Sequence, residues 1–544
     1  MKINDKEMFD YFENLIYEKG SKIEKWKKQV RTEPYGLTDF DVHSIQGAKD
    51  LFYKREDTKS QLCLLETMQK FLHEYIDIEG IEELLINNYG AIENSIFLEH
   101  DRWGNPTHIR EHAKHQIKNA YLGSILLLDF EYAKDMASNI YDGTSTVTRY
   151  LVNQAEQVLE SEYIEKSGKT ISQDEKMEPK WRNAVFEKLR EWCYEVFIVS
   201  SLLHDIGYPL EFYLRSAQEL ADYPPYLKIL SPIMKADYSE IKAHLLTSQL
   251  FKLIDNREIK KKYDKNNHGV LSAVSLLMHF YYGGRIFSLN REQRCIIEMS
   301  AIAIYRHTDR YEKGFRMVYK KDPISYMVRL CDDLQEWDRF KLIISDKHNY
   351  LRCNKCWKLL LEDQGEYSCP TCHSQYQKVT QITNRKVNYI SLCDELDLQK
   401  QKDKILITVD FSIIKQLEIL MDDYTAVLRR AKDMEAVQEF VKNQQLKPAI
   451  DVSFFLSNNP IMLIQHMIEE SGLDDGKVLK LINKQTKTRK ENLSNFFEDY
   501  KRKRKNNPFG ERLEKNELKY ADEAAAYVKQ YYGEIYSLYK LINR

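Results

Sequence analysis

The amino-acid sequence predicts a mainly α-helical protein with a small cysteine-rich element and an α+β part near the C-terminus. Glycine and proline are scarce, with 19 and 12 residues among 544. Apolar residues recur mostly at every third or fourth position, which is the period of one helix face. Runs rich in β-branched residues, typical of strands, become frequent only after about residue 385. These three observations favour a helical body followed by a smaller sheet.

Composition and charge narrow the class of protein. Charged residues make up 30% and hydrophobic residues 43% of the chain, as in ordinary globular proteins of roughly two to four domains. The net charge is −2, from 81 basic and 83 acidic residues, so no overall field directs the protein to nucleic acid. The N-terminus lacks the apolar core of a signal peptide, and the apolar stretch 270–283 is too short to span a bilayer. Nine cysteines form no disulfide framework, so we expect a reduced, cytoplasmic protein with no membrane partner.

The first half of the chain divides by composition. Residues 1–95 alternate amphipathic helices with charged turns, and we interpret them as a helical N-terminal cap or an oligomerisation element that joins copies or a protein partner. The main domain is expected over residues 96–345. Within it, residues 130–180 are polar and weakly periodic, which indicates an insertion of two flexible stretches joined by a helix over 147–162.

A pair of histidines opens the main domain. His112 and His115 are three residues apart, so both can face one side of a helix. Pro106 and Thr107 suit the first turn of that helix. The ordinary alternative is two surface histidines on an amphipathic helix.

The stretch 196–209 carries the strongest chemical signal. Eight mostly apolar residues run directly into His204 and Asp205, and a glycine and a proline then stop the helix. An imidazole and a carboxylate at the end of a buried helix are costly to bury unpaired, and they are natural ligands of a divalent metal. A second His-Asp pair begins at His100 but lies in a polar loop. The evidence for a metal site is therefore the apolar helix before His204, since the dipeptide alone occurs elsewhere in the chain.

Three later helices supply candidates of the same kind. His268 lies in the first turn of an apolar helix, and His307 closes another apolar run. Asp332 shares a helix face with apolar residues, so we expect it to be buried and to need a partner. Each residue alone could be an ordinary buried residue whose polar atoms are hydrogen-bonded within the core. Their order on successive helices favours one shared site.

This order of residues resembles the HD superfamily of metal-dependent phosphohydrolases over roughly residues 105–340, and the sequence His-Asp-Ile-Gly from His204 is the most specific part. The resemblance implies an HD-type helical bundle with one or two divalent metals. The implied ligands are His112 or His115, His204, Asp205, His268, His307 and Asp332. The chain departs from the family in the long separation before His204, which fits an insertion, and in Tyr208, where many members have Lys or His.

The resemblance also implies the chemistry. Imidazole and carboxylate ligands suit Mn, Fe, Co, Ni or Zn, with Mg as a further candidate, and one bound metal makes a hydroxide nucleophile from water. Asp205 would bridge to a second metal or orient the water, and His204 would hold the same centre. Charge that develops on the phosphoryl group needs positive side chains. The candidates close to the motifs are Arg110, Lys118, Arg306 and Arg329.

A cysteine pattern follows within residues 346–385. Two CxxC pairs, separated by 12 residues, fit a tetrahedral structural zinc, and the ligands are Cys353, Cys356, Cys369 and Cys372. The sequence between the pairs predicts a small β-hairpin. A redox role for the pairs is the alternative. Zinc ribbons of this kind often contact nucleic acid or proteins.

The C-terminal part predicts a small α+β domain over residues 386–480. Strands are expected at 387–393, 404–410 and 449–455, and helices at 413–421, at 434–442 and from Pro460 onward. A ligand-sensing or subunit-contact role fits such a module. Residues 481–544 are expected to be a basic linker, 484–505, and a closing helix, 520–542. Binding of the basic run to nucleic acid is the functional alternative to a solvated linker.

Three functions follow from these features. The first is a metal-dependent phosphohydrolase acting on a nucleotide phosphoester or phosphoanhydride, such as a dNTP, a guanosine alarmone or a cyclic nucleotide. The second is a metal-dependent nuclease acting on single strands. The third is a metal- or nucleotide-binding sensor or scaffold without turnover. Relatives with this architecture occur in nucleotide signalling and antiviral defence, which is an analogy of fold only.

Overall fold

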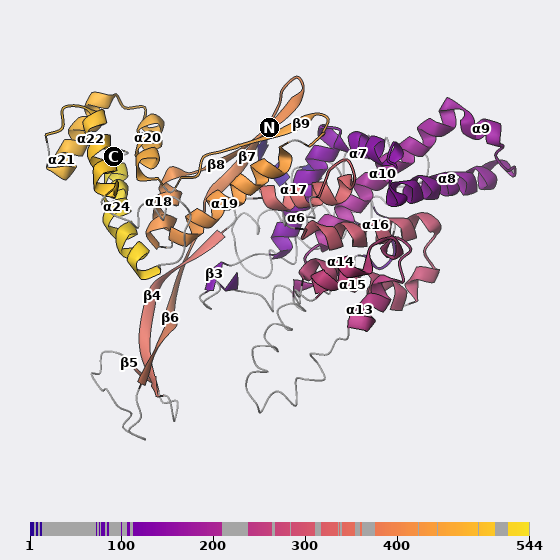
Figure 1. The fold of residues 1–544 in the computed structure, drawn as a ribbon, viewed down its shortest axis with the longest axis horizontal. Helices are drawn as coiled ribbons and strands as arrows, with labels where there is room; N and C mark the ends of the chain where they lie inside the picture. The colour runs from indigo at the N-terminus through magenta and orange to yellow at the C-terminus, as the bar shows by residue number, and fades with distance from the viewer. Residues whose placement is uncertain are drawn as a thin grey trace, which may run out of the picture.

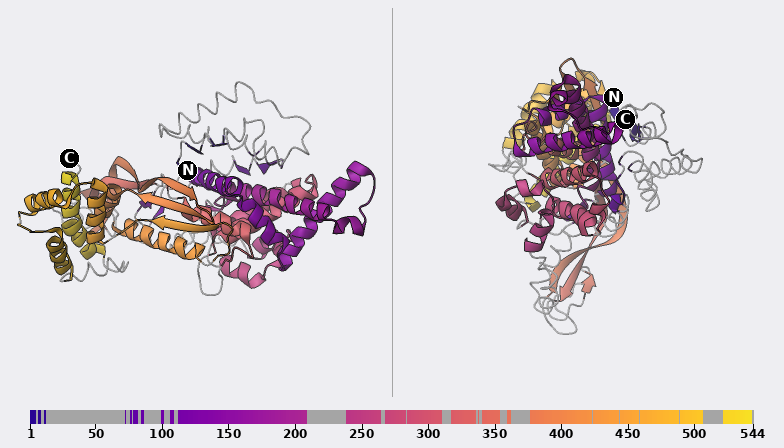
Figure 2. Two further views of the ribbon diagram at one scale, coloured as in Figure 1. Left: turned by 90° about the horizontal axis from the view of Figure 1, so that it is seen from above. Right: turned by 90° about the vertical axis from the view of Figure 1, so that its right-hand side faces the viewer.

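The computed structural model shows an elongated, mainly helical protein, with a helical bundle at one end, a sheet in the middle and further helices at the other end (Figures 1 and 2). The predicted helical class is confirmed in this coarse form, with a four-stranded sheet beside it. Within the described part of the chain, no helix is both long and apolar enough to cross a membrane. The structure describes positions within 1–12, 72–85 and 99–108, residue 337, and residues 112–208, 238–263, 267–282, 284–309, 317–335, 340–353, 359–361, 376–422, 424–442, 444–457, 459–487, 489–505 and 521–542.

Helix α10 (Pro179–Leu203) forms the centre of the bundle, where it packs against α6, α7, α16 and α17. Its last eight residues are all buried, as the apolar run before His204 predicts. Shorter helices, α13 (Tyr238–Leu245) and α14 (Asn256–Tyr263), pack against α15. The remaining bundle helices are α6 (His112–Ser124), α7 (Tyr132–Tyr141), α15 (His268–Tyr282), α16 (Arg291–His307) and α17 (Pro323–Leu334).

Capping residues explain where the last two bundle helices begin. The Asn290 side chain accepts a hydrogen bond from the Gln293 backbone, and the Gln293 side chain accepts one from the Asn290 backbone at the start of α16. At the start of α17, Asp322 caps the helix and a proline takes the first position, where no backbone N–H is needed. The helix expected to start near Pro106 begins only at His112, because β3 (Pro106–His108) pairs with β4 instead.

The segment 130–180 is helical over most of its length, so the expectation of two flexible stretches is wrong. Helices α8 (Thr146–Ser167) and α9 (Gln173–Met177) extend from the bundle beside α10 (Figure 1). Only a narrow stripe of α8 is buried, which is why its apolar periodicity is weak; its members are Thr148, Leu151, Ala155 and Val158. The predicted helix over 147–162 lies within α8.

A long antiparallel ribbon projects from the body (Figure 1). It consists of β4 (Phe340–Cys353) and β6 (Tyr376–Ser391), with β5 (Leu359–Leu361) paired to the far end of β4. Shorter strands, β2 (Glu99–His100) and β3, extend the same sheet. The strand expected at 387–393 is divided at Leu392, because β6 ends before it and β7 begins after it in a different sheet.

The four-stranded sheet has the order β1-β7-β8-β9. Strands β7 (Cys393–Lys400) and β8 (Lys404–Phe411) are antiparallel, whereas β9 (Ala449–Phe454) runs parallel to β8 after a crossover through α18 (Ile413–Asp422) and α19 (Tyr424–Val441). Alternate residues of β8 are buried, as a sheet with one covered face requires. The strands predicted at 404–410 and 449–455 and the predicted helices of this part are confirmed, and α19 begins ten residues earlier than expected.

The two ends of the chain differ from the expected organisation. The predicted N-terminal cap, residues 1–95, lies mostly outside the described residues, but β1 (Lys2–Ile3) pairs with β7. The basic run 484–505 is helical rather than a linker, because Phe496 and Tyr500 of α22 are buried one turn apart. The helices at this end are α20 (Pro460–Ser471), α21 (Asp475–Thr486), α22 (Leu493–Lys505) and the closing α24 (Ala521–Ile542).

Candidate metal centre

Six of the predicted ligand residues converge between the ends of five bundle elements. The Nε2 atom of His115 lies 2.8 Å from Asp332 Oδ1 and 3.8 Å from Asp205 Oδ2. His204 Nε2 lies 3.4 Å from Asp205 Oδ2 and 3.7 Å from Asp332 Oδ1. These four residues come from α6, from the turn after α10 and from α17, and they are buried or largely buried. Of the two candidates for the first histidine, His115 contacts the cluster, and the side chain of His112 lies outside the described residues.

The remaining two histidines face the other oxygen of Asp205. His268 Nε2 lies 3.7 Å and His307 Nε2 3.9 Å from Asp205 Oδ1. The two Nε2 atoms are 3.2 Å apart. His268 is partly exposed, whereas His307 is buried. One carboxylate therefore stands between two pairs of imidazoles.

Gly207 explains why the turn after His204 and Asp205 can approach α15. Its backbone N–H donates to Ser272 Oγ at 2.8 Å. A Cβ atom at this position would lie 2.4 Å from Ser272 N and 2.8 Å from the His268 carbonyl oxygen, both of which belong to α15. Only glycine permits this contact, and the contact brings His268 to Asp205.

Three of the histidines are oriented by hydrogen bonds at Nδ1. His204 and His307 sit at the ends of α10 and α16, where the last carbonyl groups have no partner within the helix. Their Nδ1 atoms lie 2.8 Å from the Ser201 carbonyl and 2.5 Å from the Ile304 carbonyl. A carbonyl can only accept, so each Nδ1 carries a proton, and Nε2 is the ring atom that faces the cluster; this atom holds the lone pair whenever the ring is neutral.

Gln335 orients the ring of His115 in the same way, through a hydrogen bond at Nδ1. Its side-chain oxygen is bonded to His115 Nδ1. Gln335 is buried and follows Asp332 by one turn of α17. Outer hydrogen bonds of this kind set the tautomer of ligating histidines. The sequence reasoning missed Gln335, although its three-residue spacing from Asp332 is a usable signal.

The ionisation of the cluster suits cation binding. Burial alone would raise the pKa of Asp332, but hydrogen bonds with His115 and His204 outweigh it and hold that pKa well below its usual range. Burial and the neighbouring imidazoles lower the pKa of His307. Burial also lowers the pKa of His204, yet the carboxylates of Asp205 and Asp332 together leave it raised. The carboxylate of Asp332 is thus ionised and the His307 ring neutral, which are the forms that bind metals.

The four cationic residues predicted to stabilise the phosphoryl group differ in where they lie and what they contact. Arg329 adjoins the cluster: it donates to the His307 carbonyl at 3.1 Å and pairs with Asp333 at 2.6 Å. Arg306 pairs with Asp322 at 2.5 Å, away from the ligand atoms. Lys118 is buried and donates to the Trp337 carbonyl at 2.9 Å. Arg110 lies outside the described residues.

Tyr208 is a neighbour of the cluster whose role the sequence left open. Its ring stacks on His268 with centroids 4.2 Å apart and an angle of 15° between the planes. The half-buried tyrosine therefore supports the most exposed of the six candidate ligands.

The donor set fits a metal ion. In two groups, His115 with His204 and Asp332, and His204 with Asp205 and His307, the donor atoms lie within 4.8 Å of one another. Ligands that are each about 2.0–2.2 Å from one ion stand roughly 3–4 Å apart. The described distances of 2.8–3.8 Å around His115 and His204 are of that size.

Cys353 lies at one end of the β4–β6 ribbon. Cys353 is the last residue of β4 and pairs with Tyr376, the first residue of β6. Cys356, Cys369 and Cys372 lie outside the described residues. The first CxxC spans the β4–β5 connection, whereas the second ends four residues before β6. The strand at Leu359–Leu361 pairs with β4 rather than within its own segment, so the predicted separate hairpin is not seen in the described part.

Comparison with known proteins adds no relative. No protein-family model, no curated protein and no solved structure matches the chain. The functional conclusions therefore rest on the residues and their geometry.

Proposed function

We propose that this protein is an HD-type metal-dependent phosphohydrolase that acts on a nucleotide phosphoester or phosphoanhydride. The position of Asp205 carries the proposal. Its Oδ2 faces His115 and His204, and its Oδ1 faces His268 and His307, each at 3.4–3.9 Å. A carboxylate that presents its two oxygens to two sets of imidazoles is suited to bridge two metal ions.

The ligand sets follow from this geometry. His115, His204, Asp205 and Asp332 would hold one ion, and Asp205, His268 and His307 would hold a second. Mixed imidazole and carboxylate ligands suit Mn²⁺, Fe²⁺, Co²⁺, Ni²⁺ or Zn²⁺ better than Mg²⁺. When bound, such ions lower the pKa of a coordinated water and polarise the phosphoryl group.

The chain's own residues hold the ligands in place. Nδ1 bonds fix the rings of His115, His204 and His307. Arg329 is engaged by the His307 carbonyl and by Asp333, so we assign it the positioning of α16 and α17 rather than contact with substrate. The proposal of nucleotide substrates, whether dNTP, alarmone or cyclic nucleotide, rests on the family resemblance alone.

A substrate panel tests the proposal directly. Purified full-length protein is loaded with Mn²⁺, Mg²⁺, Co²⁺ or Ni²⁺ and incubated with dNTPs, guanosine alarmones, cyclic nucleotides and single-stranded DNA and RNA. We expect hydrolysis of at least one nucleotide that depends on the metal. Asp205→Asn, which preserves shape, should abolish turnover and metal binding at this site. His466→Ala is the matched control, because His466 lies on α20 and pairs with Glu470 outside the cluster.

Two results would refute the assignment. If the metal-loaded protein hydrolyses nothing in the panel, the protein is not the proposed enzyme. If Asp205→Asn retains activity while its thermal unfolding matches the parent, the cluster is not the reaction centre. Cleavage of single strands without hydrolysis of free nucleotides would instead support a nuclease.

We also propose a structural zinc held by Cys353, Cys356, Cys369 and Cys372. The 12-residue separation of two CxxC pairs supports it, and so does the ribbon end at which Cys353 lies. Four thiolates complete a tetrahedral site without an open position. The expected role is therefore stabilisation of the ribbon end rather than catalysis.

A further inference from the structure

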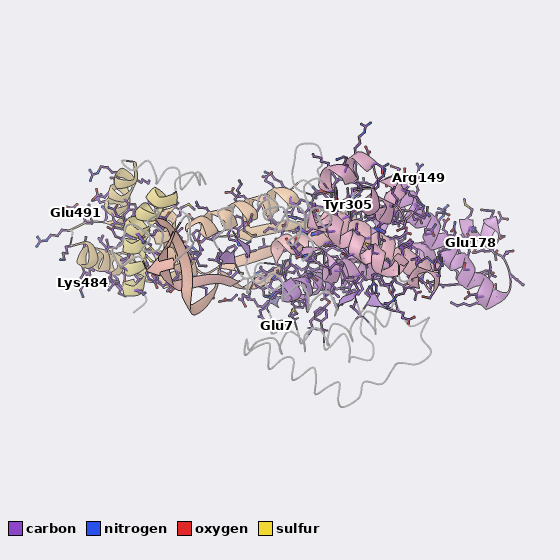
Figure 3. All side chains as sticks on the ribbon, turned by 90° about the horizontal axis from the view of Figure 1, so that it is seen from below. Glu7, Arg149, Glu178, Tyr305, Lys484 and Glu491 are labelled. Atoms are coloured by element: carbon purple, nitrogen blue, oxygen red, sulfur yellow. The ribbon has the colours of Figure 1, made fainter. Side chains whose placement is uncertain are left out.

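Positive charge is concentrated near the C-terminus. Residues 475–505 hold eleven lysines and arginines against four acidic residues, whereas the whole chain has 81 against 83. The segment forms α21, α22 and the turn between them. Figure 3 shows Lys484 at one end of the molecule and Glu178, at the tip of the α8–α10 arm, at the other.

Helix α21 has a cationic face and an apolar face. Lys477, Lys480 and Lys484 recur at spacings of three and four residues, so they form one stripe, and all three are exposed. Val478 and Ile482 are buried, and the helix packs against α24. The lysine stripe thus faces solvent.

The turn after α21 adds further cationic side chains to this stripe, and hydrogen bonds hold the backbone of the turn in place. The Asn483 side chain donates to the Lys490 carbonyl at 2.9 Å and accepts from its N–H at 2.7 Å. The Lys490 ammonium pairs with Asp499 on α22. Both ends of the turn are therefore held, and exposed Lys487 and Arg489 project from between them.

Five of the eight cations whose side chains the structure describes here make no ion pair with another described residue. Lys477 pairs with Asp474 at 3.2 Å and Arg502 with Asp499 at 2.6 Å. The other described cations of this surface are exposed and make no ion pair with any residue that the structure describes; they are Lys480, Lys484, Lys487, Arg489 and Lys501. Like charges gathered in this way repel each other unless an anion binds.

We propose that the surface formed by α21, α22 and their turn binds the phosphate backbone of single-stranded nucleic acid. Cations three to four residues apart on a helix are separated by about 4.5–6 Å along its axis, comparable to successive phosphates of an extended strand. A lipid surface would call for apolar side chains beside the cations. Among the described residues of α21 and α22, none is a large exposed apolar residue. This role is independent of the proposed hydrolase function.

The test uses full-length protein in the Asp205→Asn background, so that no turnover interferes. Fluorescence anisotropy measures binding to a labelled 20-nucleotide single strand of mixed sequence, as DNA and as RNA, over a range of salt concentrations. The variant combines Lys480→Gln, Lys484→Gln, Lys487→Gln and Arg489→Gln. A control of equal charge change replaces four other exposed lysines by Gln: Lys400, Lys402, Lys432 and Lys442.

We expect the first variant to lose at least tenfold in affinity at about 0.1 M salt and the control to bind as the parent does. Each phosphate contact contributes about 0.7 to the slope of log K against log salt, so loss of four contacts should reduce that slope by about 3. Thermal unfolding of all proteins should coincide. The proposal fails if the parent does not bind, if both variants lose affinity equally, or if only vesicles of anionic lipid bind to the surface.

Discussion

Gln335 offers the sharpest test of the candidate metal centre, because it touches no substrate and contacts the first ligand through one hydrogen bond. Its carboxamide is only 2% exposed and accepts from His115 Nδ1. Replacement by Met keeps the volume but leaves that N–H buried without an acceptor, which costs about 1–3 kcal/mol. Loss of such an outer partner weakens metal binding by about 10–100-fold. Gln335→Glu retains an acceptor and should bind metal at least as tightly as the parent.

The assay is a competition for Co²⁺ or Mn²⁺ between the protein and a chelator, with thermal unfolding recorded for the same samples. Gln416→Met provides the control: Gln416 is equally buried, and its side chain bonds Phe411 and Phe455 carbonyls in the C-terminal sheet part. The control should lose stability without loss of metal affinity. Parental affinity in Gln335→Met, or equal weakening in Gln335→Glu, would refute the assigned role.

Three further predictions concern the surroundings of the site. Gly207→Ala should displace the start of α15, since its Cβ would lie 2.4 Å from Ser272 N. In protein loaded with Mn²⁺, it should halve the bound manganese measured by elemental analysis, and full manganese occupancy would show that His268 is not a ligand. Cys353→Ser should remove one zinc per chain and lower the unfolding temperature, and unchanged zinc would contradict a structural ribbon. Arg306→Gln should lower the free energy of unfolding by about 1–2 kcal/mol, because it breaks a partly buried ion pair, and leave metal content unchanged. Lost metal would place Arg306 in the site.

The candidate ligand residues could be found from the sequence because most stand at an end of an apolar helix or on its buried face. A long apolar run is easily recognised, and a charged or ionisable residue within it or at its end is conspicuous. His115 could not be separated from His112, because both fit one helix face. The choice depends on how α6 is rotated against α10 and α17, and no local pattern records this.

The orienting contacts lay beyond sequence reasoning for a different reason. Ser201 and Ile304 act through backbone carbonyls, which every residue possesses. The contact between Gly207 and α15 joins segments 65 residues apart. Arg306 resembles Arg329 in sequence, since each lies close to a ligand. In the structure Arg329 adjoins the cluster because it reaches the His307 carbonyl and Asp332, whereas Arg306 pairs with Asp322.

The sequence did not predict the full extent of α8 or the β4–β6 ribbon, and the physical reason is the same for both. In the arm, α8 fully buries only four of its 22 residues, and the other apolar residues of its first half are only partly buried. Strands β4 and β6 gain regularity from backbone pairing along 13 registered positions rather than from an alternating apolar face. Neither element needs a broad apolar surface, so neither shows one in the sequence.

Helix α17 links the candidate site to the C-terminal part of the chain. Asp332 and Gln335 near its end contact His115, while Tyr326, two turns earlier, stacks on Phe440 of α19 with ring centroids 4.2 Å apart. The Tyr326 hydroxyl also donates to the Phe440 carbonyl at 3.0 Å. Because both contacts use one rigid helix, the position of α19 bears on the position of Asp332. Helix α19, which lies between the strands of the C-terminal sheet in the sequence, therefore supports the helix that carries one candidate ligand, Asp332, and the residue that orients another, Gln335.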